Sequence, residues 1–196
     1  MNLRTTRGRA AAAAVSALAV GGLALSASPA SASASSGYVN GSGSYYDDFA
    51  DEGTLSTASH ASSNTTCLWQ KILWAEGVKE SNGTAFDYED IDGHFGSNTK
   101  YATKKLQKAW GQTQDGIVGK KTFGSADDKW NSSTGAGELE YRSYDSGSSL
   151  KRWKLTYHGS AHAFNLYRAT SAYDGRYTFY ANNAWRPASY NANSCD

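Results

Sequence analysis

Apolar residues between positions 67 and 130 recur at the spacing of amphipathic helices. Three such stripes follow one another along the chain: Leu68, Trp69, Ile72 and Leu73; then Ala102, Leu106, Ala109 and Trp110; then Phe123, Ala126 and Trp130. The first stripe ends near Gly77, and lysines separate the apolar residues of the second. Because each helix must bury its apolar face against a neighbour, the pattern predicts a small three-helix bundle.

From Glu138 onward, apolar and polar residues alternate, which is the spacing of half-buried strands. Three runs show this alternation: Trp153, Leu155 and Tyr157; Phe164 and Leu166; and Tyr177, Phe179 and Ala181. Short glycine-containing segments at 145–147, 158–160 and 174–175 separate the runs as turns. Residues 138–196 are therefore predicted to form a small antiparallel β-sheet of three or four strands, and the fold class is predicted to be α+β.

An octapeptide is repeated inside the predicted helical region. Asp92-Gly93-His94-Phe95-Gly96-Ser97-Asn98-Thr99 recurs as Asp115-Gly116-Ile117-Val118-Gly119-Lys120-Lys121-Thr122. Asp-Gly favours a tight turn, because glycine accepts positive φ and the aspartate side chain bonds nearby amides. The second glycine lets the chain enter a helix, and Ser97 is the expected N-cap in the first copy, whereas the second copy relies on Gly119. Each copy is thus predicted to be a turn that begins a helix.

The first 34 residues have the pattern of a secretory signal peptide. Three arginines precede an apolar run over 10–25, and small residues at 30–34 offer a cleavage site. The run is short for a membrane span, so no membrane partner is expected after cleavage. Without residues 1–34 the formal net charge changes from +1 to −2, which argues against a nucleic-acid partner. The mature protein is expected to be secreted, and extracellular or associated with the cell wall.

Export also bears on the two cysteines of the chain. Cys67 and Cys195 are expected to form a disulfide in an oxidising compartment, and two free thiols are the alternative. Between the signal peptide and Cys67, residues 35–66 are rich in serine and glycine. This composition favours a disordered tail or linker with little capacity to form a core.

Two segments contain residue types that bind metals. His158 and His162 are four residues apart, but they lie in a predicted turn and lack the glutamate of the zinc-protease motif. The acidic run at 87–93 has some likeness to a calcium loop, yet Tyr88 and Thr99 stand where its first and last carboxylates belong. Surface histidines and a solvated loop are the preferred interpretations, so neither a metal nor a cofactor is expected.

No pattern indicates a catalytic residue. Both cysteines are assigned to a bridge, and no serine lies in a Gly-x-Ser-x-Gly elbow. Glu138 and Glu140 are two apart on a predicted strand, so they share a face without a cleft in which paired carboxylates would act. An exposed strand edge is the preferred interpretation of this pair.

Aromatic residues are abundant, with six tryptophans and thirteen tyrosines, and their faces suit stacking against sugar rings. Trp69, Trp110 and Trp130 are expected in the core because of their helical spacing. For the tyrosines of the sheet, two interpretations stay open, a carbohydrate-facing surface or the cover of a small core. These tyrosines are Tyr141, Tyr144, Tyr157, Tyr167, Tyr177 and Tyr180.

Four motifs follow one another along the helical region in a fixed order and at a fixed spacing. They are Leu68-Trp69-Gln70-Lys71-Ile72-Leu73, the first octapeptide, Ala102-Thr103-Lys104-Lys105-Leu106-Gln107 and the second octapeptide with Phe123. In order and spacing, residues 67–130 resemble the peptidoglycan-binding domain of bacterial cell-wall hydrolases. The chain departs from that pattern in the long acidic segment at 79–91 and in Phe123, where the family often has tryptophan. Both departures affect the expected ligand groove more than the fold.

The resemblance implies a secreted, non-catalytic protein that binds peptidoglycan or a muropeptide. The groove is expected at the two Asp-Gly turns and the adjacent helix starts, and His94 marks the first turn as the one that touches the wall. The expected ligand-binding residues are Asp92, Gly93, His94, Phe95, Gly96, Thr99, Tyr101, Asp115 and Gly116. Two alternatives remain open. The β-rich region would hold an unrecognised cell-wall hydrolase site, or the protein would be a secreted interaction or inhibitor protein that reuses the helical fold.

Overall fold

The computed structural model describes residues 34–196 except positions 136, 148, 150, 171 and 173, so the expected signal peptide lies almost entirely outside the described residues. The helices are α1 (Asn64–Ala75), α2 (Ser97–Ala109) and α3 (Lys120–Gly124), with short 3-10 turns η1 (Ala34–Ser36) and η2 (Phe49–Asp51). The strands are β1 (Leu139–Asp145), β2 (Arg152–His158), β3 (Ala163–Ala169), β4 (Tyr177–Ala181) and β5 (Ala184–Pro187). No helix among the described residues is long and apolar enough to span a bilayer.

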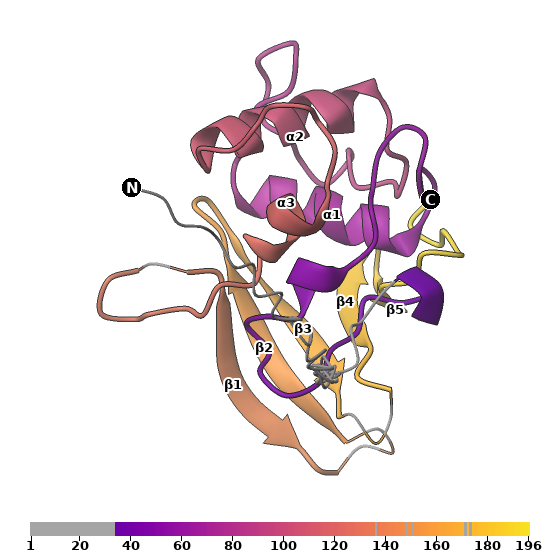
Figure 1. The fold of residues 1–196 in the computed structure, drawn as a ribbon, viewed down its shortest axis with the longest axis vertical. Coiled ribbons are helices and arrows are strands. Elements are labelled where there is room, and N and C mark those ends of the chain that lie inside the picture. Colours follow the sequence, from indigo (N-terminus) through magenta and orange to yellow (C-terminus); the bar gives the residue numbers. More distant parts are fainter. Residues whose placement is uncertain (1–33, 136, 148, 150, 171, 173) are drawn as a thin grey trace, which may run out of the picture.

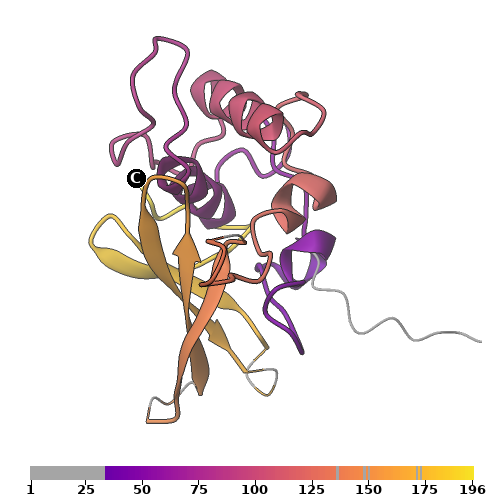
Figure 2. The same cartoon turned by 90° about the vertical axis from the view of Figure 1, so that its left-hand side faces the viewer.

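The α+β class is confirmed, but the three helices form a bundle only in part. Helix α1 lies between α2 on one side and the sheet on the other (Figures 1 and 2). Its side chains Leu68, Trp69, Ile72 and Leu73 are fully buried, which agrees with the first apolar stripe. Helix α3 has five residues and packs on η2. Trp130, expected at its end, lies beyond it.

The glycines of the repeat, and no side chain, cap α2 and α3. The N-cap of α2 is Gly96, and Ser97 is the first helical residue, so the expected Ser97 cap is wrong. Gly119 caps α3 as expected. By contrast, Ser63 caps α1, and its hydroxyl accepts a hydrogen bond from the Thr66 amide at 3.0 Å. Of the three α-helices in the described residues, only α1 therefore has a side-chain cap that satisfies a free amide.

The sheet has five antiparallel strands in sequential order, one or two more than expected. Strand β5 follows β4 through Asn182 and Asn183, both with positive φ, as two-residue hairpins require. Its four residues are too few to show alternation. In β1 the register shifts between Tyr141 and Ser143, so the period of two is broken there. These local features hid β5 from the sequence pattern and broke the alternation of β1, of which only the start, at Glu140, was expected on a strand.

Residues 35–66, expected to be a tail, are packed into the protein. Val39, Phe49 and Leu55 have no exposed surface. The Val39 amide donates to Ala188 O at 2.8 Å, and Leu55 exchanges two backbone hydrogen bonds with Val118 at 3.0 Å. The expectation of little core-forming capacity is therefore wrong, since this segment joins the sheet to the second turn of the helical region.

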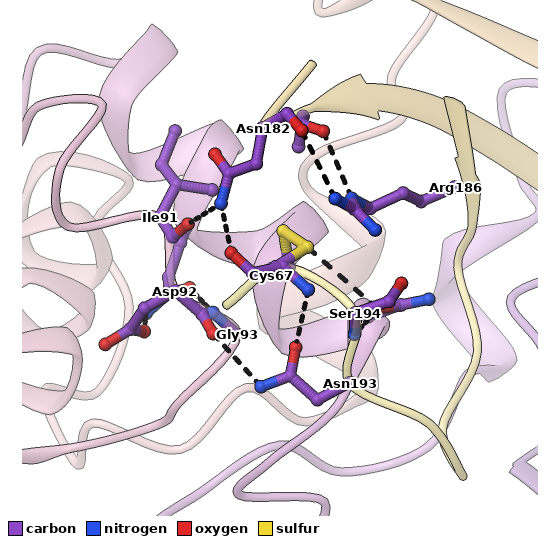
Figure 3. The surroundings of a disulfide bond; sticks show 12 residues. Cys67, Ile91, Asp92, Gly93, Asn182, Arg186, Asn193 and Ser194 are labelled. Carbon is purple, nitrogen blue, oxygen red and sulfur yellow. Dashed lines mark hydrogen bonds between the residues drawn. A yellow bond between two sulfur atoms is a disulfide. The ribbon is translucent and has the colours of Figure 1, made fainter. Parts of the chain in front are cut away.

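Cys67 of α1 and Cys195 form the predicted disulfide, with an S–S distance of 2.08 Å (Figure 3). Around the bridge, the Asn182 side chain donates to Ile91 O at 3.1 Å and to Cys195 O. The Ser194 amide donates to the Asn64 side chain at 2.8 Å. The end of the chain is thereby tied both to the start of α1 and to the segment that precedes the first repeated turn.

Candidate functional site

A glutamine side chain from α1 organises the first repeated turn. The amide nitrogen of Gln70 donates to Asp92 Oδ1 at 2.7 Å, to His94 O at 3.0 Å and to Thr99 Oγ1 at 3.1 Å. Its side-chain oxygen accepts a hydrogen bond from the Gly93 amide at 2.7 Å. Asp92 in turn accepts from the His94 amide at 2.8 Å. The turn is therefore fixed from within by one buried side chain.

The second turn repeats this arrangement with Gln107 of α2. The Gln107 nitrogen donates to Asp115 Oδ1 at 2.8 Å, to Ile117 O at 2.9 Å and to Thr122 Oγ1 at 3.2 Å. Its oxygen accepts from the Gly116 amide at 2.9 Å. The repeated unit is thus a glutamine on a helix together with the octapeptide that follows, and we call this unit the glutamine clamp.

The glycines of the Asp-Gly pairs are required by geometry. Gly93 has a φ of 75° and Gly116 a φ of 73°. A Cβ at Gly93 would lie 2.3 Å from the Asn193 side chain, and one at Gly116 would lie 3.0 Å from the backbone oxygen of Lys100. Since both glycine amides also donate to the clamps, they are satisfied within the protein and do not point to a ligand.

The expected ligand-binding residues divide into buried and accessible groups. Gly93, Phe95, Thr99 and Gly116 are buried, and they shape the turns from inside. Asp92, His94, Gly96 and Asp115 are exposed, and Tyr101 is half-buried on α2. The two turns have different neighbours, because Gly93 lies at Asn193 near the chain end whereas Gly116 lies against α2 at Lys100.

His94 is an exposed titratable group of the first turn. Its side chain is 49% exposed, and Nε2 lies 2.9 Å from Asp196 Oδ1. The Asn193 side chain donates to the neighbouring Asp92 O at 3.0 Å, as Figure 3 shows. The disulfide-linked chain end therefore forms one wall of the surface around His94.

A hollow of about 500 Å³ lies between the end of α1 and the second half of α2. Its lining combines apolar and charged side chains: Glu76, Gly77, Val78, Lys79, Lys105, Leu106, Ala109, Trp110 and Ser160. Tyr157 and Ser160 both donate to the Glu76 carboxylate, at 2.7 and 2.9 Å. The Glu76 carboxylate in the hollow therefore already accepts hydrogen bonds from side chains of the protein.

The two lysines of this hollow remain available to a ligand. Neither Lys79 nor Lys105 takes part in a salt bridge within the described part of the chain. The ammonium of Lys105 lies 5.1 Å from the centre of the Tyr101 ring, which places that expected residue at the edge of the hollow. Trp110, expected in the core, is partly buried and packs edge-on against Trp69. The sequence pattern missed this hollow because its residues come from three separate segments.

The histidines considered for metal binding and Glu140 are engaged within the protein, whereas Glu138 is partly buried and its Oε2 has no hydrogen-bond partner among the described residues. His158 stacks on Trp130 and lies 2.8 Å from Glu140, whereas His162 stacks on Trp74. Among the described residues, no group of three or more His, Cys, Asp or Glu side chains has an arrangement that would hold a metal ion. These histidines act as packing groups at the edge of the sheet.

The fold therefore consists of a small helical region with two glutamine clamps, packed on a five-stranded antiparallel sheet. Residues 70–125 match the model of a family described as a putative peptidoglycan binding domain. The match begins at Gln70 and ends just after α3, so it includes both clamps and both octapeptides. Comparisons with curated proteins and with solved structures gave no match. The sheet lies outside the matched residues.

Proposed function

We propose that this protein is secreted and binds bacterial peptidoglycan, without cleaving it, through its helical region. The observation that carries the proposal is the family match over residues 70–125. The disulfide supports the secreted location, because such bonds persist in oxidising compartments. The expected signal peptide lies outside the described residues and rests on the sequence pattern alone.

Three parts of the helical region supply contacts in this proposal: the hollow, the first turn and the second turn. In the hollow, Lys79 and Lys105 offer cations to the carboxylates of the peptide stem, and Trp110 offers an apolar face to the sugar or its acetamido group. Tyr101 extends this surface through its contact with Lys105. At the first turn, the exposed Asp92, His94 and Gly96 would contact the wall, as would Asp115 at the second turn.

The buried turn residues have a supporting role in the same proposal. Gly93, Phe95, Thr99 and Gly116 hold the shape of the surface without direct access to a ligand. Because the clamps fix both turns from within, the exposed side chains are held in place before a ligand arrives. Such preorganisation lowers the entropy cost of binding.

Co-sedimentation with insoluble peptidoglycan tests the proposal, and suspension turbidity measures cleavage in the same tube. The full mature protein is expected to pellet with the wall and to leave turbidity unchanged. His94→Ala and the double variant Lys79→Ala/Lys105→Ala are compared with Lys108→Ala, an exposed lysine of α2 outside the hollow. If turbidity falls, the protein is a hydrolase, which is the first alternative. If Lys108→Ala weakens co-sedimentation and the other two variants do not, the binding surface proposed at His94 and the hollow is wrong.

A further inference from the structure

A second hollow, of about 720 Å³, lies on the sheet rather than on the helical region. Five of its eight lining residues are aromatic, and none carries a formal charge: Gly43, Ser44, Tyr45, Tyr46, Tyr141, Tyr144, Trp153 and Thr170. We call it the aromatic groove. Strands β1 and β2 supply Tyr141, Tyr144 and Trp153, and the segment before η2 supplies the tyrosines opposite.

The register shift in β1 creates this groove. Tyr141 pairs with Leu155 and Tyr144 pairs with Trp153, so both tyrosines share the inner face with the buried Leu155. Residues three apart on a regular strand would lie on opposite faces. The extra residue between Tyr141 and Ser143 therefore brings a second tyrosine to the inner face, where the sheet extends beyond the helices.

Four of the five rings of the groove, those of Tyr45, Tyr46, Tyr141 and Trp153, contact one another. The Tyr141 and Trp153 centroids lie 6.2 Å apart at 88°, and Tyr45 lies 6.4 Å from each of them. Tyr46, Tyr141 and Tyr144 nevertheless keep 40%, 44% and 45% of their surfaces exposed. Edge-to-face contacts thus orient the rings of Tyr46 and Tyr141, which remain accessible to a ligand.

A buried ion pair supports the groove from beneath. The Arg168 guanidinium lies 4.3 Å from the centre of the Trp153 ring, and Arg168 is 2% exposed. It donates to Asp48 Oδ2 at 2.5 Å and to Gly43 O at 2.8 Å. Since Arg168 contacts β2 and the 43–48 segment at once, it fixes the two walls relative to each other. Its charge is balanced by Asp48, so this buried pair adds no net charge to the groove.

We propose that the aromatic groove binds a neutral oligosaccharide chain. Pyranose rings present flat C–H faces that stack on tyrosine and tryptophan, while the tyrosine hydroxyls, Ser44 and Thr170 offer hydrogen bonds to sugar hydroxyls. The uncharged lining matches an uncharged glycan better than an acidic or basic peptide. This site is separate from the helical region, and the inference does not depend on peptidoglycan binding there.

Isothermal titration of the full mature protein with soluble chitooligosaccharides and cellooligosaccharides tests the inference. Binding of at least one sugar is expected, and the one that binds shows whether the acetamido group is recognised. Tyr144→Ala is expected to weaken binding at least about fivefold, because it removes one stacking ring. Tyr144→Phe keeps the ring, so this variant is expected to bind within about twofold of the wild type. It is the control for a folding defect caused by substitution at this position.

Tyr180→Ala is the matched control. Tyr180 is 44% exposed but alternates with the buried Phe179, so it lies on the opposite face of the sheet. Unchanged binding by this variant supports the groove, and an equal loss in Tyr180→Ala and Tyr144→Ala overturns it. Absence of binding to both sugars also overturns the inference. The variant Lys79→Ala/Lys105→Ala should keep oligosaccharide binding, so failure of the helical site is distinguishable from failure of the groove.

Discussion

Gln70 and Gln107 make the same four hydrogen bonds to the two copies of the repeated octapeptide. Each donates to an aspartate, a backbone oxygen and a threonine, and each accepts from the glycine amide of its turn. The sequence distance to the aspartate is 22 residues for Gln70 and 8 for Gln107. The clamp is therefore constant although the connecting segments differ, which identifies the helix and the turn as one structural unit.

Loss of either glutamine is expected to destabilise the protein. Gln70→Ala or Gln107→Ala leaves the buried glycine amide of its turn without a partner, which costs about 1–3 kcal/mol of unfolding free energy. Urea denaturation measures this loss. Gln114→Ala, at an exposed position, is the control. Equal stability of Gln107→Ala and Gln114→Ala would contradict the role given to the clamp.

Gly116→Ala tests the conformation of the second turn. A side chain there combines a positive φ with an approach to the Lys100 backbone, so a loss of at least about 1 kcal/mol is expected. Gly147→Ala is the control, because its Cβ would be 3.8 Å from its nearest neighbour and a change within about 0.5 kcal/mol is expected. Thermal unfolding compares them. If Gly116→Ala leaves the stability unchanged, the turn can rearrange to accept the side chain, which contradicts the prediction.

The disulfide is expected to contribute strongly to stability. It closes a loop with a sequence separation of 128 residues, and the chain-entropy argument gives up to about 5 kcal/mol. The variant Cys67→Ser/Cys195→Ser should unfold at much lower urea concentration than the wild type. Reductant should shift the wild type toward the variant and leave the variant unchanged. If the wild type without reductant and the variant unfold at the same urea concentration, the prediction is contradicted.

Buried carboxyl groups predict lower stability at alkaline pH. Burial raises the pKa of Glu138 to about 8, and the negative charges of Asp128 and Glu76 add to the effect. Burial likewise raises the pKa of Asp127 to about 8 and that of Glu52 to about 7. Each group keeps its proton in the folded protein over a range where the unfolded chain has lost it. Their contribution to stability is therefore present at acid pH and lost as pH rises through the folded pKa.

Glu138→Gln isolates one of these groups. The variant should raise the melting temperature by a few degrees at about pH 8.5 and change it little at about pH 4.5, because only the ionised carboxylate is penalised. Glu89→Gln, in an exposed loop, is the control and should leave the pH profile unchanged. If the melting temperatures of Glu138→Gln and the wild type change with pH in parallel, this carboxyl group is not the source of the stability loss at alkaline pH.

Local patterns in the sequence predicted the features that depend on near neighbours. The stripe at 68–73 gave α1, and the Asp-Gly pairs gave both positive-φ turns. The pairing of Cys67 with Cys195 followed from their number and from the expected export. The roles of Gln70 and Gln107 did not follow, because a glutamine on a helix shows no local sign of a partner in a later loop.

Long-range packing decided the features that the pattern missed. Residues 35–66 have few apolar side chains, but Val39, Phe49 and Leu55 all enter the shared core. Of the two interpretations of the sheet tyrosines, the core cover holds for two residues, and the carbohydrate-facing surface stays a prediction for the exposed ones. Tyr157 and Tyr177 are fully buried in the core, whereas Tyr141, Tyr144 and Tyr180 are exposed. The β1 register shift, which brings Tyr144 to the same face as Tyr141, has no signature in a single sequence.

Co-sedimentation of the full mature protein with insoluble peptidoglycan, measured for the wild type and for Lys79→Ala/Lys105→Ala, tests the central claim most directly. The wild type should pellet with the wall, and the double variant should bind at least about tenfold more weakly because it loses two cations from the hollow. Lys108→Ala should bind like the wild type. A wild-type protein that stays in the supernatant would contradict the account and favour an interaction protein that reuses the helical fold.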